Sequence, residues 1–312
     1  MIHETQFSGP SDMRAMCDLC IALRKSGLGA EHSGDLNWAA YMHSEMNPQR
    51  DTRLWWDGAA LAAWATWNKY GLTFALSYPQ RENLGLLRRI LAWAKDHVRA
   101  LSSDGVPPKV FSTGCFASHL PHARMLAELG FTLSQAGSLF VSARALSVPL
   151  PELALPAGVV IRPPEGEHEL DRRALLHATV WHPSKVTPAG YRITRSAPGY
   201  DATLDLVAVM PDGSLGAYCI CWPEAATGSC EFEPVGTHPD HRRKRLASAV
   251  IYAAMRRARQ IGLHTALVYC AEANLPFYQS LGFSPIDRTV EYVKPFEEVT
   301  DGERTDVRDF TV

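Results

Sequence analysis

The residues at 241–245 (HRRKR) form the most concentrated basic run of the chain, and a helical pattern follows them directly. From Leu246 onward, apolar residues recur at three- and four-residue spacing, which predicts an amphipathic helix. The first turn of a helix has backbone N–H groups without partners and a partial positive charge. Phosphate oxygens bind at such a place, so the pattern predicts a phosphate-binding loop. A solvated basic loop is the alternative interpretation.

A strand is expected immediately before this loop, at 230–237. Phe232 and Val235 supply its apolar positions, and Pro239 ends it because proline cannot donate to a sheet. Glu231 and Glu233 are two residues apart and therefore share one face of the strand. The loop and its helix are thus positioned by the end of a strand that carries two carboxylates.

Two segments of the sequence resemble one known family. The segment Arg242-x-x-Arg245-Leu246-Ala247, with the valine-bearing strand and the H-P-x-x-R residues before it, resembles the Q/R-x-x-G-x-G/A signature of the GNAT superfamily of N-acetyltransferases. Downstream, 277–283 (FYQSLGF) is similar to the family segment in which a short helix carries a tyrosine, here Tyr278. The resemblance covers about 158–296.

The resemblance implies a reaction and residues to perform it. In this family an amine generally attacks acetyl-CoA directly, a strand carboxylate or a water that it orders acts as base, and the tyrosine acts as acid. These roles fall on Glu231 and Glu233, one or both of which can be the base, and on Tyr278. The alternatives are a solvated sheet face for the glutamates and a core aromatic for the tyrosine. His182 and His238 are further candidates for the base.

The resemblance also implies which residues bind acetyl-CoA. The backbone of the strand end is expected to pair with the pantetheine amides, and the loop and helix start are expected to hold the pyrophosphate. The expected cofactor-binding residues are Val235, Thr237, Arg242, Arg243, Lys244, Arg245, Leu246, Ala247 and Asn274. Two positions depart from the family pattern. Asn274 lies closer to Tyr278 than is usual, and Arg245 replaces a glycine, so that it either obstructs the loop or adds a phosphate contact.

Composition sets broader limits on the protein. At 312 residues, with 46% hydrophobic and 21% charged residues, the chain can form two globular domains. The net charge of -2 gives no reason to expect binding to nucleic acid or an anionic membrane. No apolar stretch approaches the length of a signal-peptide core or a membrane span, so we expect a cytoplasmic protein. Seven cysteines, an odd number without paired metal-ligand spacing, favour reduced thiols and no metal site.

The order of the expected elements is similar in the two parts of the chain. In the first part we expect helices at 13–25, 36–45, 84–99 and 122–129, and strands at 54–56, 59–67, 72–77, 109–112, 131–133 and 139–141. In the second part we expect strands at 158–162, 204–210, 216–222, 230–237 and 264–269, and helices at 167–181 and from 246. The proline-rich stretch LSVPLPELALPA predicts a linker between them.

The predicted fold is therefore α/β (α+β), with two tandem GNAT-like domains, each a mixed and mostly antiparallel sheet flanked by helices. We expect a degenerate domain at 1–145, a linker at 146–157 and the catalytic domain at 158–312. The first copy has Pro79-Gln80-Arg81-Glu82-Asn83-Leu84 where the second has its basic loop, and no tyrosine at the place of Tyr278. It is expected to serve packing or to shape the acceptor site.

Three functions remain open at this point. The favoured one is an N-acetyltransferase that transfers the acetyl group of acetyl-CoA to a primary amine of a small molecule, acting as a monomer or a homodimer. The alternatives are a protein or peptide acetyltransferase and a catalytically silent acyl-CoA-binding sensor. Trp181, His182 and Tyr191 are expected near the acceptor by fold analogy.

Overall fold

The first half of the chain follows the order of elements that its sequence predicts. The computed structural model describes residues 1–42, 46–102, 106–134 and 137–299, so the end of the helix expected at 36–45 lies outside the described residues. The strands are β1 (Ile2–Gln6), β2 (Thr52–Asp57), β3 (Ala60–Asn68), β4 (Gly71–Leu76), β5 (Val110–Phe116), β6 (Thr132–Leu133) and β7 (Leu139–Ala145). The helices are α1 (Pro10–Lys25), α2 (Ser33–Met42), α3 (Pro48–Asp51), α4 (Leu84–Leu101) and α5 (Leu120–Glu128), with the 3-10 turn η1 (Tyr78–Gln80). The sequence pattern did not predict β1 or α3.

The second half repeats this plan. Its strands are β8 (Val160–Arg162), β9 (Asp205–Val209), β10 (Leu215–Glu224), β11 (Ser229–Thr237), β12 (Thr265–Cys270) and β13 (Ser284–Pro295). Its helices are α6 (Gly166–Val180), α7 (Pro188–Thr194), α8 (Leu246–Gln260) and α9 (Leu275–Ser280). Four 3-10 turns complete it: η2 (Ala202–Leu204), η3 (Pro239–His241), η4 (Glu272–Asn274) and η5 (Phe296–Glu298).

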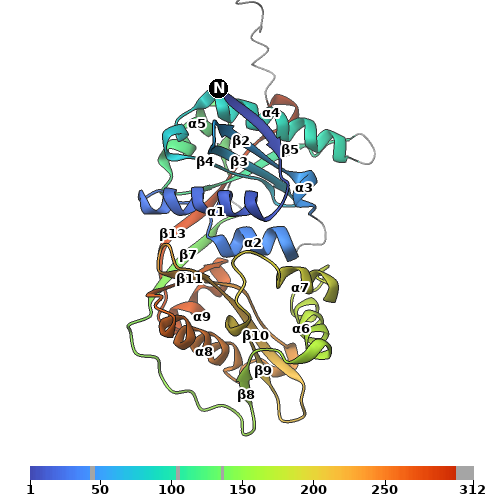
Figure 1. Ribbon diagram of the computed structural model, residues 1–312, viewed down its shortest axis with the longest axis vertical. Helices are drawn as coiled ribbons and strands as arrows, with labels where there is room; N and C mark the ends of the chain where they lie inside the picture. The colour runs from blue at the N-terminus through green and yellow to red at the C-terminus, as the bar shows by residue number, and fades with distance from the viewer. Residues whose placement is uncertain (43–45, 103–105, 135–136, 300–312) are drawn as a thin grey trace, which may run out of the picture.

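One mixed sheet runs through both halves (Figure 1). In the described part of the chain it has thirteen strands, and twelve of them follow the order β1-β2-β3-β4-β5-β13-β7-β12-β11-β10-β9-β8. The pairs β4–β5 and β11–β12 are parallel, and the other pairs are antiparallel. The predicted α/β class, with a mixed and mostly antiparallel sheet flanked by helices, is confirmed.

The two halves exchange strands at the centre of this sheet. β13, from the end of the second half, lies between β5 and β7 and pairs with both. β7, from the end of the first half, pairs with β12 of the second half. Figure 1 shows these two strands crossing the waist of the molecule. The domain boundaries expected from the sequence stay a prediction about folding units, because the hydrogen-bonded sheet continues across them.

The segment between β7 and β8 contains no helix or strand, in agreement with its prolines. It is nevertheless fixed to the second half. Leu146 is buried in the core of that half, and its amide donates to the His264 carbonyl oxygen at 2.8 Å. The linker therefore packs along the surface of the second half.

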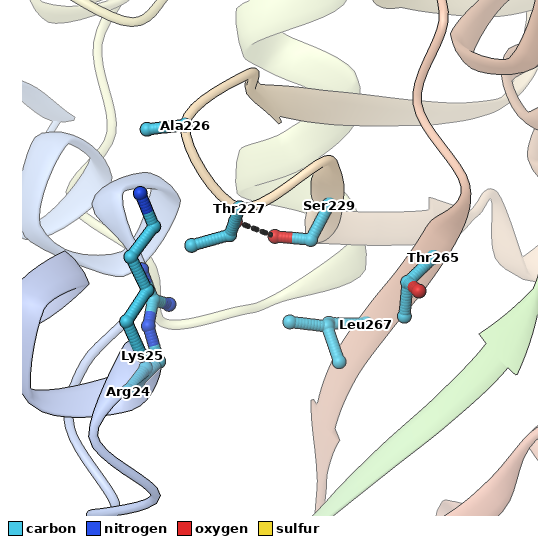
Figure 2. Close-up of a pocket in the computed structure, with 7 residues that line it drawn as sticks. All are labelled: Arg24, Lys25, Ala226, Thr227, Ser229, Thr265 and Leu267. Carbon is cyan, nitrogen blue, oxygen red and sulfur yellow. Dashed lines mark hydrogen bonds between the residues drawn. The ribbon is translucent and has the colours of Figure 1, made fainter.

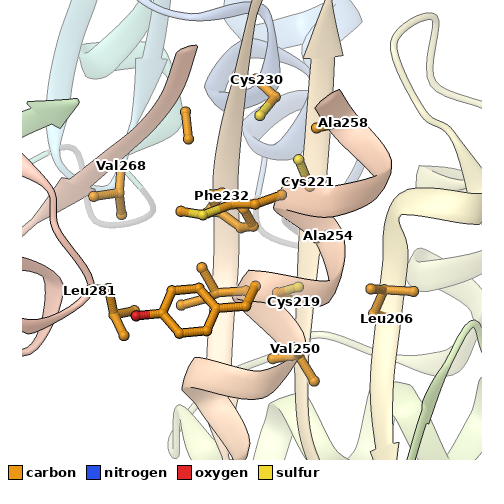
Figure 3. Close-up of a cluster of buried hydrophobic side chains, with 14 of the residues drawn as sticks. Leu206, Cys219, Cys221, Cys230, Phe232, Val250, Ala254, Ala258, Val268 and Leu281 are labelled. Atoms are coloured by element: carbon orange, nitrogen blue, oxygen red, sulfur yellow. The ribbon is translucent and has the colours of Figure 1, made fainter. Parts of the chain in front are cut away.

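The core of the second half lies between α8 and the sheet. Figure 3 shows Val250, Ala254 and Ala258 of α8 beside the thiols of β10 and β11, which belong to Cys219, Cys221 and Cys230. All seven cysteines are free and buried, and burial raises the thiol pKa of most of them. The prediction that these cysteines lie in the core is confirmed.

Candidate active site

β11 separates from β12 partway along its length. The two strands pair only at Ser229, Cys230 and Glu231, opposite the first three residues of β12. Beyond this point β11 continues to Thr237 and pairs with β10 alone, placing Val235 opposite Cys219 and Thr237 opposite Ala217. Among the described strands, none covers the other edge of 232–237. Backbone amides and carbonyls at such an edge can bind an extended ligand as an added strand.

The basic run 241–245 follows this open edge. Arg242, Arg243 and Arg245 are exposed, and within the described residues their guanidinium groups form no hydrogen bond or ion pair. Lys244 Nζ lies 3.2 Å from the Asp240 carbonyl oxygen. Three arginine side chains are thus available to an anion that binds at the start of α8.

Arg245 resolves a question that the sequence leaves open. Its backbone has φ 61° and ψ 16°, the left-handed conformation that glycine adopts without strain. The arginine therefore follows the backbone conformation that suits the family's glycine, at a cost of about 1–2 kcal/mol. Its side chain is exposed and does not cap α8. Leu246 is buried in the core and Ala247 is half-buried, so Leu246 can offer a ligand only its backbone amide.

The short helix α9 carries Tyr278 next to the core. The ring is 9% exposed and lies 5.8 Å from the ring of Phe283. Burial raises the pKa of the Tyr278 hydroxyl, and the negative charge of Glu233 adds to this effect. The hydroxyl forms no hydrogen bond with any other described residue. Asn274, the N-cap of α9, is exposed, and its side chain makes no capping bond.

The two glutamates of β11 occupy different environments. Glu231 is fully buried, Glu233 is half-buried, and the strand register shifts between Phe232 and Val235, around Glu233. Burial raises the pKa of each carboxyl to about 8, and for Glu231 the charge of Glu233 is the next cause. The structure thus brings the two glutamates within electrostatic reach of each other, with Tyr278 within reach of Glu233.

The first half of the chain supplies the surroundings of Glu231. Its Oε2 accepts from the Asp35 amide at 3.0 Å and lies 3.0 Å from His32 Nδ1. The Asp35 carboxyl hydrogen-bonds to Glu231, and burial raises its pKa well above the usual value. A Cβ on Gly34 would collide with the Glu231 carboxylate and Trp222, so only glycine allows this close approach. Oε1 of Glu231 is buried without a hydrogen-bond partner among the described residues.

Sequence reasoning missed these residues of the first half. The stretch 31–35 (EHSGD) holds three ionisable groups in five positions directly before an apolar helix, which was the available signal. In the structure, burial raises the pKa of Glu31 to about 7 and lowers that of His32 to about 3. The helix α2 begins within this stretch, at Ser33, and contacts α7, β10 and β11, so it fixes the stretch against the second half.

Glu224 of β10 anchors the other side of this cluster. Its carboxylate accepts from Arg24, from the Ser33 hydroxyl, and from Thr227 Oγ1 at 2.6 Å. These partners and the nearby His32 outweigh its burial and lower its pKa to about 2. Glu224 is therefore ionised and joins α1 to the second half.

Comparisons with known proteins agree with this arrangement. The acetyltransferase (GNAT) family model matches residues 179–283. A curated mycothiol acetyltransferase of Thermobispora bispora is 30% identical over 218 residues, covering 66% of this chain and 70% of the relative. The chain belongs to the GNAT family of acetyltransferases. A second mycothiol acetyltransferase, from Salinispora arenicola, is 28% identical over 248 residues, with 75% of this chain and 72% of the relative covered.

The solved structures extend the likeness to both halves of this GNAT protein. A tandem GNAT protein from the clavulanic acid biosynthesis pathway superposes with a TM-score of 0.66, covering 95% of this chain and 99% of that one. At 14% identity the likeness concerns the fold alone. The predicted tandem GNAT arrangement is confirmed, and the protein is an acyltransferase.

One residue expected at the acceptor pocket of the GNAT fold has a different place. Tyr191 is fully buried, and its hydroxyl donates to Asp205, which lies 3.5 Å from the buried Arg173. It therefore holds α7 onto β9 and does not line an open pocket, which corrects the expectation from fold analogy. Trp181 is 49% exposed and His182 is exposed, so both remain accessible.

A cavity of about 360 Å³ opens between the end of α1 and the β10–β11 turn (Figure 2). Arg24 and Lys25 line one side, and the hydroxyl side chains of Thr227, Ser229 and Thr265 line the other. Figure 2 also shows the hydrogen bond of 2.6 Å between Thr227 and Ser229. The cavity thus meets the polar cluster around Glu224.

Two kinds of feature are absent from the described part of the chain. No helix there has the length and apolar character needed to cross a membrane. No group of three or more His, Cys, Asp or Glu side chains is arranged there to bind a metal ion.

Proposed function

We propose that this GNAT protein transfers the acetyl group of acetyl-CoA to a primary amine of a small molecule by direct attack. The observation that carries the proposal is the carboxyl of Glu231. It is fully buried, its pKa is about 8, and its Oε1 has no partner among the described residues. It also lies where β11 leaves β12, which is where the open strand edge begins. A base with a pKa near the working pH is well suited to proton transfer.

Acetyl-CoA, the acetyl donor, fits the residues next to the Glu231 carboxyl. The open edge at Val235 and Thr237 can pair with the amides of pantetheine, and the unpaired guanidinium groups of Arg242, Arg243 and Arg245 can bind the phosphates. Lys244 adds charge, the amides of Leu246 and Ala247 face the same anion, and Asn274 offers an uncommitted side chain. These residues are the proposed acetyl-CoA site.

Two side chains of this protein perform the two proton transfers of the reaction. Glu231 accepts the proton of the acceptor amine at Oε1, which makes the nitrogen nucleophilic. Tyr278 gives the proton to the departing sulfur, because its raised pKa keeps the hydroxyl protonated and no described residue holds it.

The test starts with the acceptor. The curated relatives are named mycothiol acetyltransferases, so the unacetylated form of mycothiol is the first amine to incubate with acetyl-CoA. A panel of small amines and a lysine-containing peptide completes the set, and mass spectrometry detects the acetylated product. Acetylation of the peptide alone would replace the small-molecule proposal. Binding of acetyl-CoA in calorimetry, with no product from the whole panel, would favour a sensor.

The variant that tests the mechanism is Glu231→Gln. We expect kcat to fall by about 10²–10⁴, the usual contribution of a general base, with unchanged affinity for acetyl-CoA. In the wild type, kcat/KM should rise with pH through about 8, because the base must lose its proton first. Glu233→Gln is the matched variant on the same strand. If it lowers kcat more than Glu231→Gln does, Glu233 is the base.

A further inference from the structure

The position of Glu231 raises the question of where its proton goes. The side chain is fully buried in the structure, and an acceptor that reaches Oε1 blocks that side, so a proton taken from the acceptor needs another route to bulk water. The next turnover requires its release. Groups that connect this carboxyl to the surface are therefore candidates for a part in the reaction, and this question rests on the function proposed above.

A row of hydrogen-bonding side chains leads from Glu231 to the cavity of Figure 2. Glu231 Oε2 lies 3.0 Å from His32 Nδ1, and His32 Nε2 lies 3.2 Å from Ser229 Oγ. Ser229 Oγ lies 2.6 Å from Thr227 Oγ1. Ser229 and Thr227 both line the cavity between α1 and the β10–β11 turn. Each distance is within hydrogen-bond range, so the row is continuous.

The backbone defines the direction of these bonds. The Gly34 amide donates to His32 Nδ1 at 3.0 Å, so the ring proton is on Nε2 and is donated to Ser229. Glu231 Oε2 can approach Nδ1 favourably only when it carries a proton. The Thr227 hydroxyl donates to Glu224 Oε1 at 2.6 Å, which leaves Thr227 Oγ1 free to accept from Ser229. The donors of Glu231, His32 and Ser229 then point toward the cavity, whereas the Thr227 hydroxyl points to Glu224.

We propose that His32, Ser229 and Thr227 form a proton relay that carries the acceptor's proton from Glu231 to the cavity beside α1. His32 belongs to the first half, whereas Ser229 and Thr227 belong to the second. The half that lacks the basic loop would thus complete the path that regenerates the base.

The transfers balance. Glu231 starts as the carboxylate and takes the amine proton at Oε1. A half-turn of the carboxyl group then brings this O–H to His32 Nδ1, which accepts the proton and restores the carboxylate. His32 gives its Nε2 proton to Ser229, which passes its own proton to Thr227 Oγ1 or to water in the cavity. When Thr227 accepts a proton, it gives its own hydroxyl proton to Glu224 Oε1, and Glu224, whose pKa is about 2, releases that proton to water. Rotation of the hydroxyls and a half-turn of the imidazole restore the starting arrangement, and one proton has left per turnover.

The proton rests on Glu231 rather than on His32, because burial raises the pKa of Glu231 to about 8 and lowers that of His32 to about 3. A charged His32 is therefore only a transient species in the relay.

The charges around His32 have opposite effects on its pKa. Glu224 on β10 lies 3.9 Å from Nε2 and favours a proton on the ring, and Arg24 on α1 opposes it. The other titratable groups of the cluster are Glu231 on β11, Tyr269 on β12, and Glu31 and Asp35 next to His32 in the chain. Glu224 therefore supports the passage of a positive charge through His32.

The deciding experiment compares Ser229→Ala with the wild type in H₂O and D₂O. Acetyl-CoA and the amine with the highest turnover in the panel serve as substrates. We expect Ser229→Ala to lower kcat by about 10-fold or more, to increase the solvent isotope effect on kcat, and to leave the affinity for acetyl-CoA unchanged. Ser229→Thr, which restores a hydroxyl, should recover most of kcat. A merely structural serine would not change the isotope effect.

Ser142→Ala is the matched control. Ser142 is a buried serine on a strand of the same sheet, its hydroxyl has no partner among the described residues, and it should keep wild-type kcat. If Ser229→Ala does not fold, Thr227→Val tests the next hydroxyl in the same way. Wild-type kcat and isotope effect in these variants, beside a slow Glu231→Gln, would overturn the relay alone. A fast Glu231→Gln would overturn the base assignment and the relay together.

Discussion

The two halves differ most at the junction of a strand with the start of a long helix. In the first half, Asn83 caps α4 by accepting from the Leu86 amide at 3.0 Å. Arg81 in the same loop donates to the Tyr78 carbonyl oxygen at 2.8 Å and lies 4.2 Å from the centroid of its ring. In the second half, Arg245 at the start of α8 provides no cap, and its loop leaves three guanidinium groups exposed.

This difference shows what an anion site requires of a helix. Both helices begin with amides that need an acceptor. α4 receives one from its own side chain, which stabilises a helix by about 1 kcal/mol, whereas α8 leaves its amides for an external anion. The second half therefore gives up local stability where the first half keeps it, as binding sites commonly do.

The ends of the parallel strands differ in the same way. β4 and β5 also pair briefly, at Leu72 and Thr113, before they separate. Phe74 of β4 then contacts His122 of α5, with ring centroids 4.7 Å apart and both side chains buried. The first half thus uses this region for packing, and it contributes His32 and Asp35 to the surroundings of Glu231.

The prediction with the largest expected effect concerns Tyr278 of α9 and its counterpart on α5 of the first half. Tyr278 lies four residues before Gly282, and the corresponding position before Gly130 is Leu126. Tyr278→Phe should lower kcat by about 10²–10⁴ if the hydroxyl is the general acid. The melting temperature should stay the same, because no described residue bonds to the hydroxyl.

Measurement of kcat and the melting temperature on one preparation separates the two interpretations of Tyr278. Tyr252→Phe, at a buried tyrosine of α8 in the same core, is the control and should keep wild-type kcat. Unchanged turnover in Tyr278→Phe would remove the tyrosine from the mechanism. A loss of about 1 kcal/mol of stability with normal kcat would indicate a structural hydroxyl.

The next effect concerns binding at the two junctions. Replacing Arg242 and Lys244 with alanine should weaken acetyl-CoA binding by about 1–3 kcal/mol, because charge-assisted hydrogen bonds to phosphate are lost. Arg81→Ala at the first junction should leave the affinity unchanged. Isothermal titration at low and high salt measures both, and the difference should shrink with salt. Equal effects at the two junctions would contradict the assignment of acetyl-CoA to the second half.

The sequence predicted those parts of the fold that depend on local pattern. The Asp57-Gly58 turn between two apolar runs gave the β2–β3 hairpin, and the apolar spacing after Leu246 gave α8. Strand exchange could not be predicted in this way. β13 pairs with β5 across more than half of the chain, and such pairing is decided by tertiary packing rather than by neighbouring residues.

The candidate site divides along the same line. The loop and Tyr278 were found because their residues are contiguous or at a characteristic spacing. His32 and Asp35 were missed because their role arises only when α2 of the first half packs on β11. Local sequence also gave no indication that burial would raise the pKa of Glu231 to about 8. Residues that act across the two halves could be identified only from the structure.

The prediction with the smallest expected effect tests whether the first junction contributes to stability but not to acetyl-CoA binding. Asn83→Ala removes the cap of α4 and should lower the free energy of unfolding by about 1 kcal/mol, with unchanged affinity for acetyl-CoA. Asn274→Ala is the matched control for stability, because Asn274 also stands at a helix start but makes no capping bond. Urea unfolding, followed by tryptophan fluorescence and by far-ultraviolet circular dichroism, gives the free energy of unfolding of both variants.

The same curves show whether the halves unfold together. Since β7 and β13 join the halves in one sheet, the two probes should report one transition, shifted as a whole by Asn83→Ala. Two transitions, of which only one shifts, would mean that the halves unfold independently despite their exchanged strands.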